Sequence, residues 1–481
     1  MRIPAQGKSH TQVKAELEGF AQRDAKWRDG KTMGYIYDAG PEVEEIAKWA
    51  FMRYLTENAL APATFPSLMQ IENELVAMAA AHLGEVPGVV GNFTSGGTES
   101  CMLAVKTARD FARATRGITQ PEAILPVTAH AAFQKGCHYL GVKKVLVPVD
   151  PVTFRSDPAV IEKAITPNTV LIVSSAVSYA HGVLDPIADI GRVAQKHKLL
   201  FHVDGCIGGF LLPYFKRLGA TLGEFDFRVP GVTSMSMDFH KYAYCPKGAS
   251  VLLHRSKDLR RFQFFVTADW TGYTIINPTI QSAKSGGPMA AAWAVLNAVG
   301  DDGYMRLAER IYEATKVIVA GIRATPGLRV LGAPDSNQVA FTSDNFSCFH
   351  IIDEMAARGW GVQPQFGYHG SEANVHISIG QKTFEQANDF LVALRAAVEA
   401  GSAKGFSQAA AKVKSQLAHA NGADFEPAML GDLMRAAGIE DGQLPRQFAE
   451  LNQILNVLPP KATEFVLTEF MNERYIHREK R

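Results

Sequence analysis

The sequence predicts an α/β protein with two main parts: a large domain containing a mostly parallel sheet flanked by helices, and a smaller C-terminal α/β domain. Strand-like apolar runs alternate with helix-like runs between about residues 86 and 290. Beyond about residue 300, an amphipathic run is followed by shorter strand-like runs. This alternation favours a parallel sheet, because two parallel strands need a crossover connection that is usually a helix.

The composition argues against several classes of protein. The formal net charge of +1 gives no electrostatic reason to expect a nucleic acid or an anionic membrane as a partner. The five cysteines are scattered and lack the spacing of metal ligands, so we expect a reducing compartment and no metal site. The N-terminus lacks a signal-peptide pattern and no run of about 20 apolar residues occurs. We therefore expect a cytoplasmic protein without an integral membrane segment.

Residues 1–85 are predicted to be mainly helical. The runs at 43–55 and 68–84 carry apolar residues at three- and four-residue steps, and Pro62 and Pro66 lie between them. This spacing predicts two amphipathic helices that each bury one face.

Residues 86–300 are assigned to the large domain. The run "GPMAAAWAVLNAVG" from Gly287 is too short to cross a bilayer and predicts a buried helix. Six strand-like runs precede it, namely "AILPV", "KVLVPV", "VLIVSSAV", "LLFHVDG", "VTSMSM" and "ASVLLHR".

Residues 301–400 are assigned to the smaller domain, which begins with the amphipathic helix predicted at 305–324. The strand-like runs "LRVLG", "NQVAF" and "ANVHISIG" follow it. Residues 401–481 are predicted to be a mainly helical extension, whose last two helices are separated at Pro459 and Pro460.

The stretch "VTSMSMDFHKYAYCPKGASVLLHR" places Lys241 in a turn between two predicted strands. Most lysines are solvated surface residues, and that interpretation applies to any lone lysine. A lysine held in such a turn is instead partly desolvated, which lowers its pKa and frees an amine that can attack a carbonyl carbon. The context therefore indicates a candidate Schiff-base lysine.

Three further stretches carry candidate functional residues. In "SGGTES", Gly96, Gly97 and Thr98 open a predicted helix, whose free N–H groups can hold a phosphate. Asp204 ends an apolar strand, where ligands gather in open α/β sheets. His130 lies among alanines, which leave room for a flat ring against it. Taken singly, each has a structural explanation: a capped loop, a turn carboxylate and a packed core histidine.

Taken together, these residues provide the parts that hold pyridoxal 5′-phosphate. They are a phosphate cradle, a carboxylate for the pyridine nitrogen, a stacking residue and an anchoring lysine. We therefore predict that the protein is an enzyme that uses this cofactor.

The chain resembles the sphingosine-1-phosphate lyases, within the group II decarboxylase branch of fold-type I pyridoxal-phosphate enzymes. The similarity extends from about Trp27 to about Ala400. It is carried by "TSGGTES", "AHAAF", "HGVLDP", "HVDGCIGGF", "FDFRVPGVTS", "DFHKYAYCPKG", "FFVTADW" and "NPTIQSAKSGG". The resemblance implies the fold-type I transferase fold with a seven-stranded sheet. It also implies the bacterial form, which lacks the membrane anchor of the eukaryotic relatives.

By position, the resemblance makes Lys241 the Schiff-base lysine, Asp204 the partner of the pyridine nitrogen and His130 the residue stacked on the ring. It implies that Gly286 and Gly287 complete the pocket from a neighbouring subunit, so we expect a homodimer with a shared active site to which the N-terminal segment contributes. The implied cofactor-binding set is Gly96, Gly97, Thr98, His130, Ser175, Asp204, His240, Lys241, Gly286 and Gly287.

The implied reaction is the retro-aldol cleavage of a phosphorylated long-chain amino alcohol such as sphingosine-1-phosphate, which gives a fatty aldehyde and phosphoethanolamine. Lys247 matches a family position near the substrate, where its ammonium binds phosphate or moves protons. Tyr37 keeps a tyrosine that the family uses in the same region. The implied catalytic residues are Lys241, Lys247, His130 and Tyr37.

Three positions depart from the family pattern. A histidine associated with substrate phosphate is replaced by Ala61, a tyrosine by Ile275 and a glycine by Ala243. Losing one hydrogen bond to a charged group removes about 1.5–3 kcal/mol, so these departures leave open a substrate different from that of the family. Tyr273 lies two residues before Ile275 and is a candidate to compensate.

Other functions remain open at this point. An amino-acid decarboxylase would use the same cofactor residues but expel a carboxylate. An inactive relative that serves as an interaction scaffold is disfavoured by the complete set of cofactor residues. An aminotransferase is disfavoured because the resemblance lies in another branch.

Overall fold

The computed structural model describes residues 2–419 and 447–477. A seven-stranded sheet has strand order β1-β7-β6-β5-β4-β2-β3, and β3, β2, β4, β5 and β6 run parallel while β7 is antiparallel to both its neighbours. This confirms the predicted seven-stranded, mostly parallel sheet. The strands are β1 (Val90–Thr94), β2 (Glu122–Pro126), β3 (Lys143–Val147), β4 (Thr169–Ser175), β5 (Leu200–Asp204), β6 (Ser234–Asp238) and β7 (Ser250–His254).

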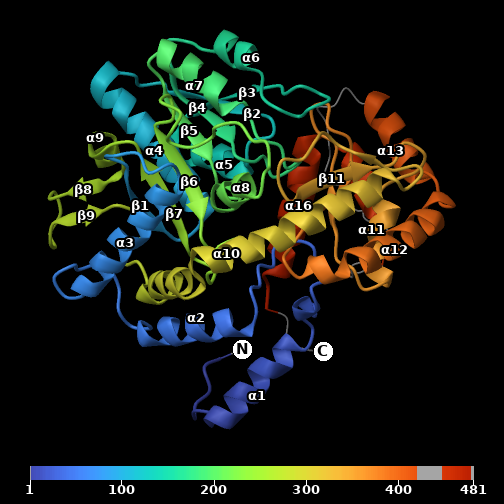
Figure 1. The fold of residues 1–481 in the computed structure, drawn as a ribbon, viewed down its shortest axis with the longest axis horizontal. Helices are drawn as coiled ribbons and strands as arrows, with labels where there is room; N and C mark the ends of the chain where they lie inside the picture. The colour runs from blue at the N-terminus through green and yellow to red at the C-terminus, as the bar shows by residue number, and fades with distance from the viewer. Residues whose placement is uncertain (1, 420–446, 478–481) are drawn as a thin grey trace.

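Helices pack around this sheet, and the main core is made of their apolar faces and of strands that are buried along their length (Figure 1). Strands covered by helices in this way read as apolar runs, which made β2, β4, β5 and β7 predictable, whereas β6 was predicted from its alternation of serine and methionine. The covering helices are α4 (Gly97–Arg116), α5 (Ala131–Leu140), α6 (Pro158–Lys163), α7 (Ile187–Lys196), α8 (Gly208–Arg217) and the short α9 (Lys257–Arg260).

The N-terminal segment contains the two predicted helices and one that was not predicted. The two are α2 (Pro41–Arg53) and α3 (Pro66–His82), and each begins at a proline. The additional helix, α1 (His10–Ala21), has no buried residue and is capped by Ser9. A hairpin of β8 (Phe265–Thr267) and β9 (Ile275–Asn277), also not predicted, extends from the edge of the molecule (Figure 1).

The long α10 (Gly286–Arg323) runs from the large sheet to a second, smaller sheet (Figure 1). Its course is broken at Gly300, which has φ 62° and ψ 171°, so the runs predicted as separate helices lie on either side of this break. The smaller sheet has the order β10-β11-β13-β12 and is antiparallel. It comprises β10 (Arg329–Val330), β11 (Gln338–Thr342), β12 (Gln363–Gln365) and β13 (Asn374–Ser378), and it packs with α11 (Phe349–Ala357) and α12 (Thr383–Ser402).

In the described part of the C-terminal extension, α13 (Gln408–His419), α15 (Ala449–Val457) and α16 (Pro460–Arg474) are helical. The boundary between the last two falls at Pro459 and Pro460, as the sequence predicted. The prediction of a mainly helical extension also covers 420–446 and 478–481, which lie outside the described residues. Among the helices described, none is long and apolar enough to cross a membrane.

Candidate active site

A cavity of about 620 Å³ lies at the carboxyl ends of β4, β5 and β6 and at the N-terminus of α4. Ligands bind at this edge in open α/β sheets, because the strand ends and helix N-termini converge there. Most of the predicted site residues line it, namely Tyr37, Gly96, Gly97, Thr98, His130, Ser175, Asp204, His240, Lys241 and Lys247. The fold thus brings together side chains that are separated by up to 210 positions, from Tyr37 to Lys247.

One wall of the cavity is the turn that opens α4. Gly96 is the N-cap, and no side chain caps the helix, so the N-terminal end of α4 faces the cavity uncapped. A Cβ at Gly97 would lie 2.8 Å from both the Cys206 Sγ and an oxygen of Asp238, so only glycine fits there. Gly96 has φ 149°, a backbone conformation that side chains rarely allow. The turn is therefore shaped for close approach of an anion to backbone N–H groups.

Asp204 ends β5 and projects into the cavity with 6% of its surface exposed. Its Oδ1 accepts hydrogen bonds from the Cys206 backbone N–H at 3.0 Å and from the Ser236 hydroxyl at 3.2 Å. These bonds fix one carboxylate oxygen. Ser175 lies beside Asp204 at the end of β4, where the register pairs the two residues.

Lys241 forms an ion pair with Asp238, the last residue of β6, at 2.8 Å between Nζ and Oδ2. Burial alone would lower the pKa of Lys241, but the neighbouring Asp238 carboxylate outweighs it and raises this pKa above the usual lysine range. The pKa of Asp238 is lowered in turn, because the charge of Lys241 overcomes the cost of its burial. The expectation that the pKa of Lys241 would be lowered is thus wrong for the chain as it stands.

The two predicted histidines lie on different walls of the cavity. His240 is 3.5 Å from the Asp238 carboxylate through Nε2 and accepts the Ala249 backbone N–H through Nδ1, while burial lowers its pKa to about 4. His130 caps α5, since its Nδ1 accepts the Ala132 N–H at 3.2 Å. The imidazole of His130 is exposed and lines the cavity.

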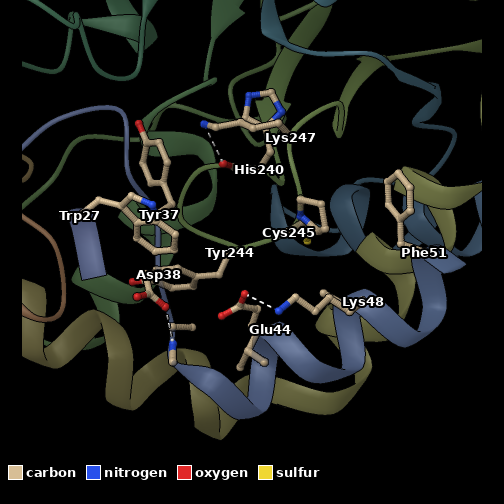
Figure 2. Close-up of a pocket in the computed structure, with 15 residues that line it drawn as sticks. Trp27, Tyr37, Asp38, Glu44, Lys48, Phe51, His240, Tyr244, Cys245 and Lys247 are labelled. Carbon is tan, nitrogen blue, oxygen red and sulfur yellow. Dashed lines mark hydrogen bonds and ion pairs between the residues drawn. The ribbon is translucent and has the colours of Figure 1, made fainter. Parts of the chain in front are cut away.

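Lys247 lies where the main cavity meets a second one of about 360 Å³, between α2 and the chain at 240–247 (Figure 2). Its Nζ is 4.5 Å above the ring of Tyr37 and 3.4 Å from the His240 carbonyl oxygen. Burial and the charge of Lys241 lower the pKa of Lys247 to about 8, and burial raises that of Tyr37 to about 12. Glu44 and Lys48, one turn apart on α2, line this second cavity and form an ion pair (Figure 2).

Several predicted positions lie outside the main cavity in the single chain. Gly286 and Gly287 begin α10 and pack against the Glu57 carbonyl and the Phe51 ring, and neither lines the cavity. Ala61 is exposed, and Ile275 lies in β9 on the projecting hairpin.

The packing also places the candidate compensating residue, Tyr273, and the third departing position, Ala243. Tyr273 is 62% exposed and packs on Trp270, so it does not point into the cavity of its own chain. Ala243 is fully buried, and its carbonyl oxygen accepts the Tyr304 hydroxyl at 2.9 Å.

Asp238 and Tyr179 are among the cavity residues that sequence reasoning missed. Asp238 was recognised only as part of a polar turn, although a carboxylate three residues before a candidate lysine at a strand end is a usable signal. Tyr179 lines the cavity and donates a hydrogen bond to Gln363 of the smaller sheet. No local pattern predicts Tyr179, because its role depends on a contact across 184 positions.

The cavity fits pyridoxal 5′-phosphate by its own features. It has a carboxylate at one strand end, an uncapped helix N-terminus where Gly97 leaves no room for a Cβ, and a buried lysine. Asp238 Oδ1 is buried without a hydrogen-bond partner in the described structure. Such an orphaned acceptor is expected where a polar ligand completes the site.

The chain is similar to known proteins over most of its length. Residues 35–344 match the family described as "Pyridoxal-dependent decarboxylase conserved domain", and residues 408–473 match "Pyridoxal-dependent enzyme, C-terminal putative HTH domain". The sphingosine-1-phosphate lyase of Dictyostelium discoideum is 40% identical over 74% of this chain and 67% of that protein. The "Probable L-aspartate decarboxylase" of Pyrococcus furiosus is 32% identical over 76% of this chain and 96% of that protein.

Among solved structures, the sphingosine-1-phosphate lyase of Burkholderia pseudomallei aligns with a TM-score of 0.80 at 35% identity, covering 89% of this chain and 98% of that chain. These similarities confirm the predicted fold class and the predicted cofactor, pyridoxal 5′-phosphate. The chain therefore belongs to the pyridoxal-dependent decarboxylase family, in the branch of the sphingosine-1-phosphate lyases, and is a lyase that uses pyridoxal 5′-phosphate.

Proposed function

We propose that the protein is an aldehyde-lyase that cleaves the Cα–Cβ bond of a phosphorylated long-chain amino alcohol of the sphingosine-1-phosphate type. The products are a fatty aldehyde and phosphoethanolamine. The observation that carries the proposal is that Lys241 and Asp204 line one cavity together with a second lysine, Lys247. Among the described residues, Lys247 forms no ion pair with a carboxylate. Seven curated relatives named sphingosine-1-phosphate lyase, 36–42% identical, support the same substrate class.

The cofactor supplies an electron sink for the bond that breaks. Lys241 would hold the cofactor through its amine. The Asp204 carboxylate, fixed by its two hydrogen bonds, would keep a proton on the pyridine nitrogen. The uncapped end of α4 and His240 would bind the cofactor phosphate, with His130 against the ring and Ser175 in the cavity wall.

Lys247 and Tyr37 act on the substrate side of the cavity. With a pKa near 8, Lys247 exists in both protonation states around neutral pH. The charged form binds the substrate phosphate, and the neutral form takes the proton of the substrate hydroxyl. The Tyr37 ring stabilises the ammonium by a cation–π contact, and its hydroxyl stays protonated as a hydrogen-bond donor.

The active form is proposed to be a cytoplasmic homodimer with a shared active site. Gly286 and Gly287 do not reach the cavity of their own chain, so their family role requires a second copy. Large apolar side chains are exposed on α2 and on the β8–β9 hairpin, which a partner subunit would cover. They are Trp49, Met52, Phe265, Val266, Trp270, Tyr273 and Ile276.

Mass spectrometry of the products tests the substrate. Purified, cofactor-loaded protein is incubated with sphingosine-1-phosphate and, separately, with a mixture of amino acids. We expect a long-chain aldehyde and phosphoethanolamine from the first reaction and no primary amine from the second. Unchanged sphingosine-1-phosphate would overturn the proposal.

An amino-acid decarboxylase is the second candidate. It is favoured by the two lost polar partners at Ala61 and Ile275 and by the similarity to the Pyrococcus furiosus protein. The same experiment distinguishes the two candidates, because a decarboxylase would release carbon dioxide and a primary amine from one amino acid and leave sphingosine-1-phosphate intact.

A further inference from the structure

Two thiols and a carboxylate converge at the floor of the cofactor cavity. The Sγ atoms of Cys101 and Cys206 and a carboxylate oxygen of Asp204 all lie within 4.8 Å of one another. The three residues come from α4, from the end of β5 and from the chain that follows it. All three are buried, and in the part of the chain that the structure describes no other group of three such residues comes together in this way.

This donor set matches the ligands that zinc-like cations prefer. Zinc binds thiolate sulfur at about 2.3 Å and carboxylate oxygen at about 2.0–2.2 Å, so two sulfurs on one tetrahedral ion lie about 3.8 Å apart. Ligand atoms already within 4.8 Å therefore need to move by less than about 1 Å. Cysteine spacing in the sequence gave no sign of this, because Cys101 and Cys206 are 105 positions apart.

An ion can reach this group through the cofactor cavity. Cys101, Asp204 and Cys206 all line that cavity. The Ser236 hydroxyl is 3.2 Å from the Cys206 Sγ and 3.2 Å from the Asp204 Oδ1, so a polar neighbour already links two of the three ligands. Such an outer partner orients ligands around a metal.

The proposed lyase mechanism uses neither of these two thiols. Burial raises the pKa of Cys101, and contact with Cys101 together with burial raises that of Cys206. Binding of a thiophilic cation forms two sulfur–metal bonds and releases two S–H protons to solvent.

We propose that the cofactor-free protein binds one thiophilic divalent cation of the zinc or cadmium class through Cys101, Asp204 and Cys206, and that this cation and pyridoxal 5′-phosphate exclude each other. The exclusion follows because both need the Asp204 carboxylate. The metal-bound form is a blocked state of the apoenzyme, and the loaded enzyme is protected from it.

The test uses cadmium on the full-length protein with the cofactor removed. We expect one ion per chain after desalting, an ultraviolet cadmium–thiolate absorption band, and release of two protons to a weakly buffered solution. Cofactor added afterwards should bind at least about 10-fold more slowly, whereas protein loaded with cofactor first should retain no cadmium. Equal cadmium binding by the loaded and cofactor-free proteins would overturn the exclusion.

Cysteine variants test the ligands. Cys101→Ser and Cys206→Ser should each weaken cadmium binding at least about 10-fold. Cys137→Ser is the matched control, because Cys137 is also buried but lies on α5 outside the cavity. Its cadmium binding should equal that of the unmodified protein. Cadmium binding by Cys101→Ser that equals the control would overturn the assignment, and the competition on the unmodified protein stands independently of how either variant folds.

Discussion

The cofactor half and the substrate half of the cavity are built in different ways. Asp204 and Asp238 end two neighbouring strands of the large sheet, and the α4 turn lies beside them. Hydrogen bonds fix Asp204, and close packing constrains the turn. Tyr37 and Lys247 come from an N-terminal segment and a loop, and they meet through a cation–π contact. The difference indicates that the cofactor site is formed by the fold itself, while the substrate side depends on how separate segments assemble.

The largest expected effect is at the cofactor lysine. Lys241→Ala should abolish the absorption band of the lysine-bound cofactor and lower activity by about 10³-fold or more. The reason is that no other side-chain amine takes over the bond to the cofactor. Absorption spectroscopy and product formation measure both effects. Lys247→Ala should keep the band, and a band retained by Lys241→Ala would contradict the account.

Asp204→Asn should lower kcat by about 10²-fold or more, even at saturating cofactor, because the amide cannot hold the pyridine nitrogen in its protonated form. Ser236→Ala is the matched comparison, since it removes only the hydroxyl that bonds Asp204 Oδ1. A smaller loss is expected there. Equal kcat for Asp204→Asn and the unmodified protein would remove Asp204 from the mechanism.

Asp238→Asn should shift cofactor binding to lower pH. Burial lowers the pKa of Lys241, whereas Asp238 is the largest of the groups that raise it, so the substitution shifts this pKa downward. A larger fraction of Lys241 is then the neutral amine at any pH below its original pKa, and the pH midpoint for reconstitution falls. The rate at which the cofactor band appears, followed across pH, checks this. A midpoint that rises or stays would contradict the ion-pair interpretation.

The same pair has a stability consequence. The lowered pKa of Asp238 contributes stability above about pH 4 that is lost on acidification, and the raised pKa of Lys241 contributes stability below about pH 10 that is lost on alkalinisation. Thermal unfolding of the cofactor-free protein should therefore show a loss of about 3–5 kcal/mol for Asp238→Asn near pH 7.

The smallest effect is expected on the substrate side. Lys247→Met should raise KM for a phosphorylated substrate by about 10- to 100-fold, which corresponds to one charge-assisted hydrogen bond. In the unmodified protein, KM should rise above about pH 8 as Lys247 loses its charge. If kcat instead rises through the same pH range while KM stays constant, Lys247 acts as the proton acceptor and does not bind the phosphate.

The sequence predicted β2 to β7, most of them from apolar runs and β6 from its alternation of serine and methionine. It missed β1, since Gly91 and Asn92 interrupt the run on an edge strand, and it missed the hairpin strands, which have three residues each. Lys241 and Asp204 were recognisable from local context. The Asp238 ion pair and the Cys101–Cys206 contact were not, because the partners of such contacts are set by the packing of different elements.

For Lys241 and Lys247, the pKa values and the positions in the cavity point to different lysines as the one that binds the cofactor. By pKa alone, Lys247 is the more reactive amine, since its pKa is about 8 whereas that of Lys241 is raised by Asp238. By position, Lys241 lines the same cavity as Asp204 and the α4 turn and is paired with the strand-end carboxylate of Asp238. We expect position to decide, because a cofactor held at Asp204 and α4 would present its aldehyde to Lys241.

Reductive trapping tests this claim most directly. The loaded enzyme is treated with borohydride, digested and mapped by mass spectrometry, which locates the cofactor on one amine. The account predicts the added mass on Lys241 and none on Lys247. Cofactor mass on Lys247, with Lys241 unmodified, would contradict it.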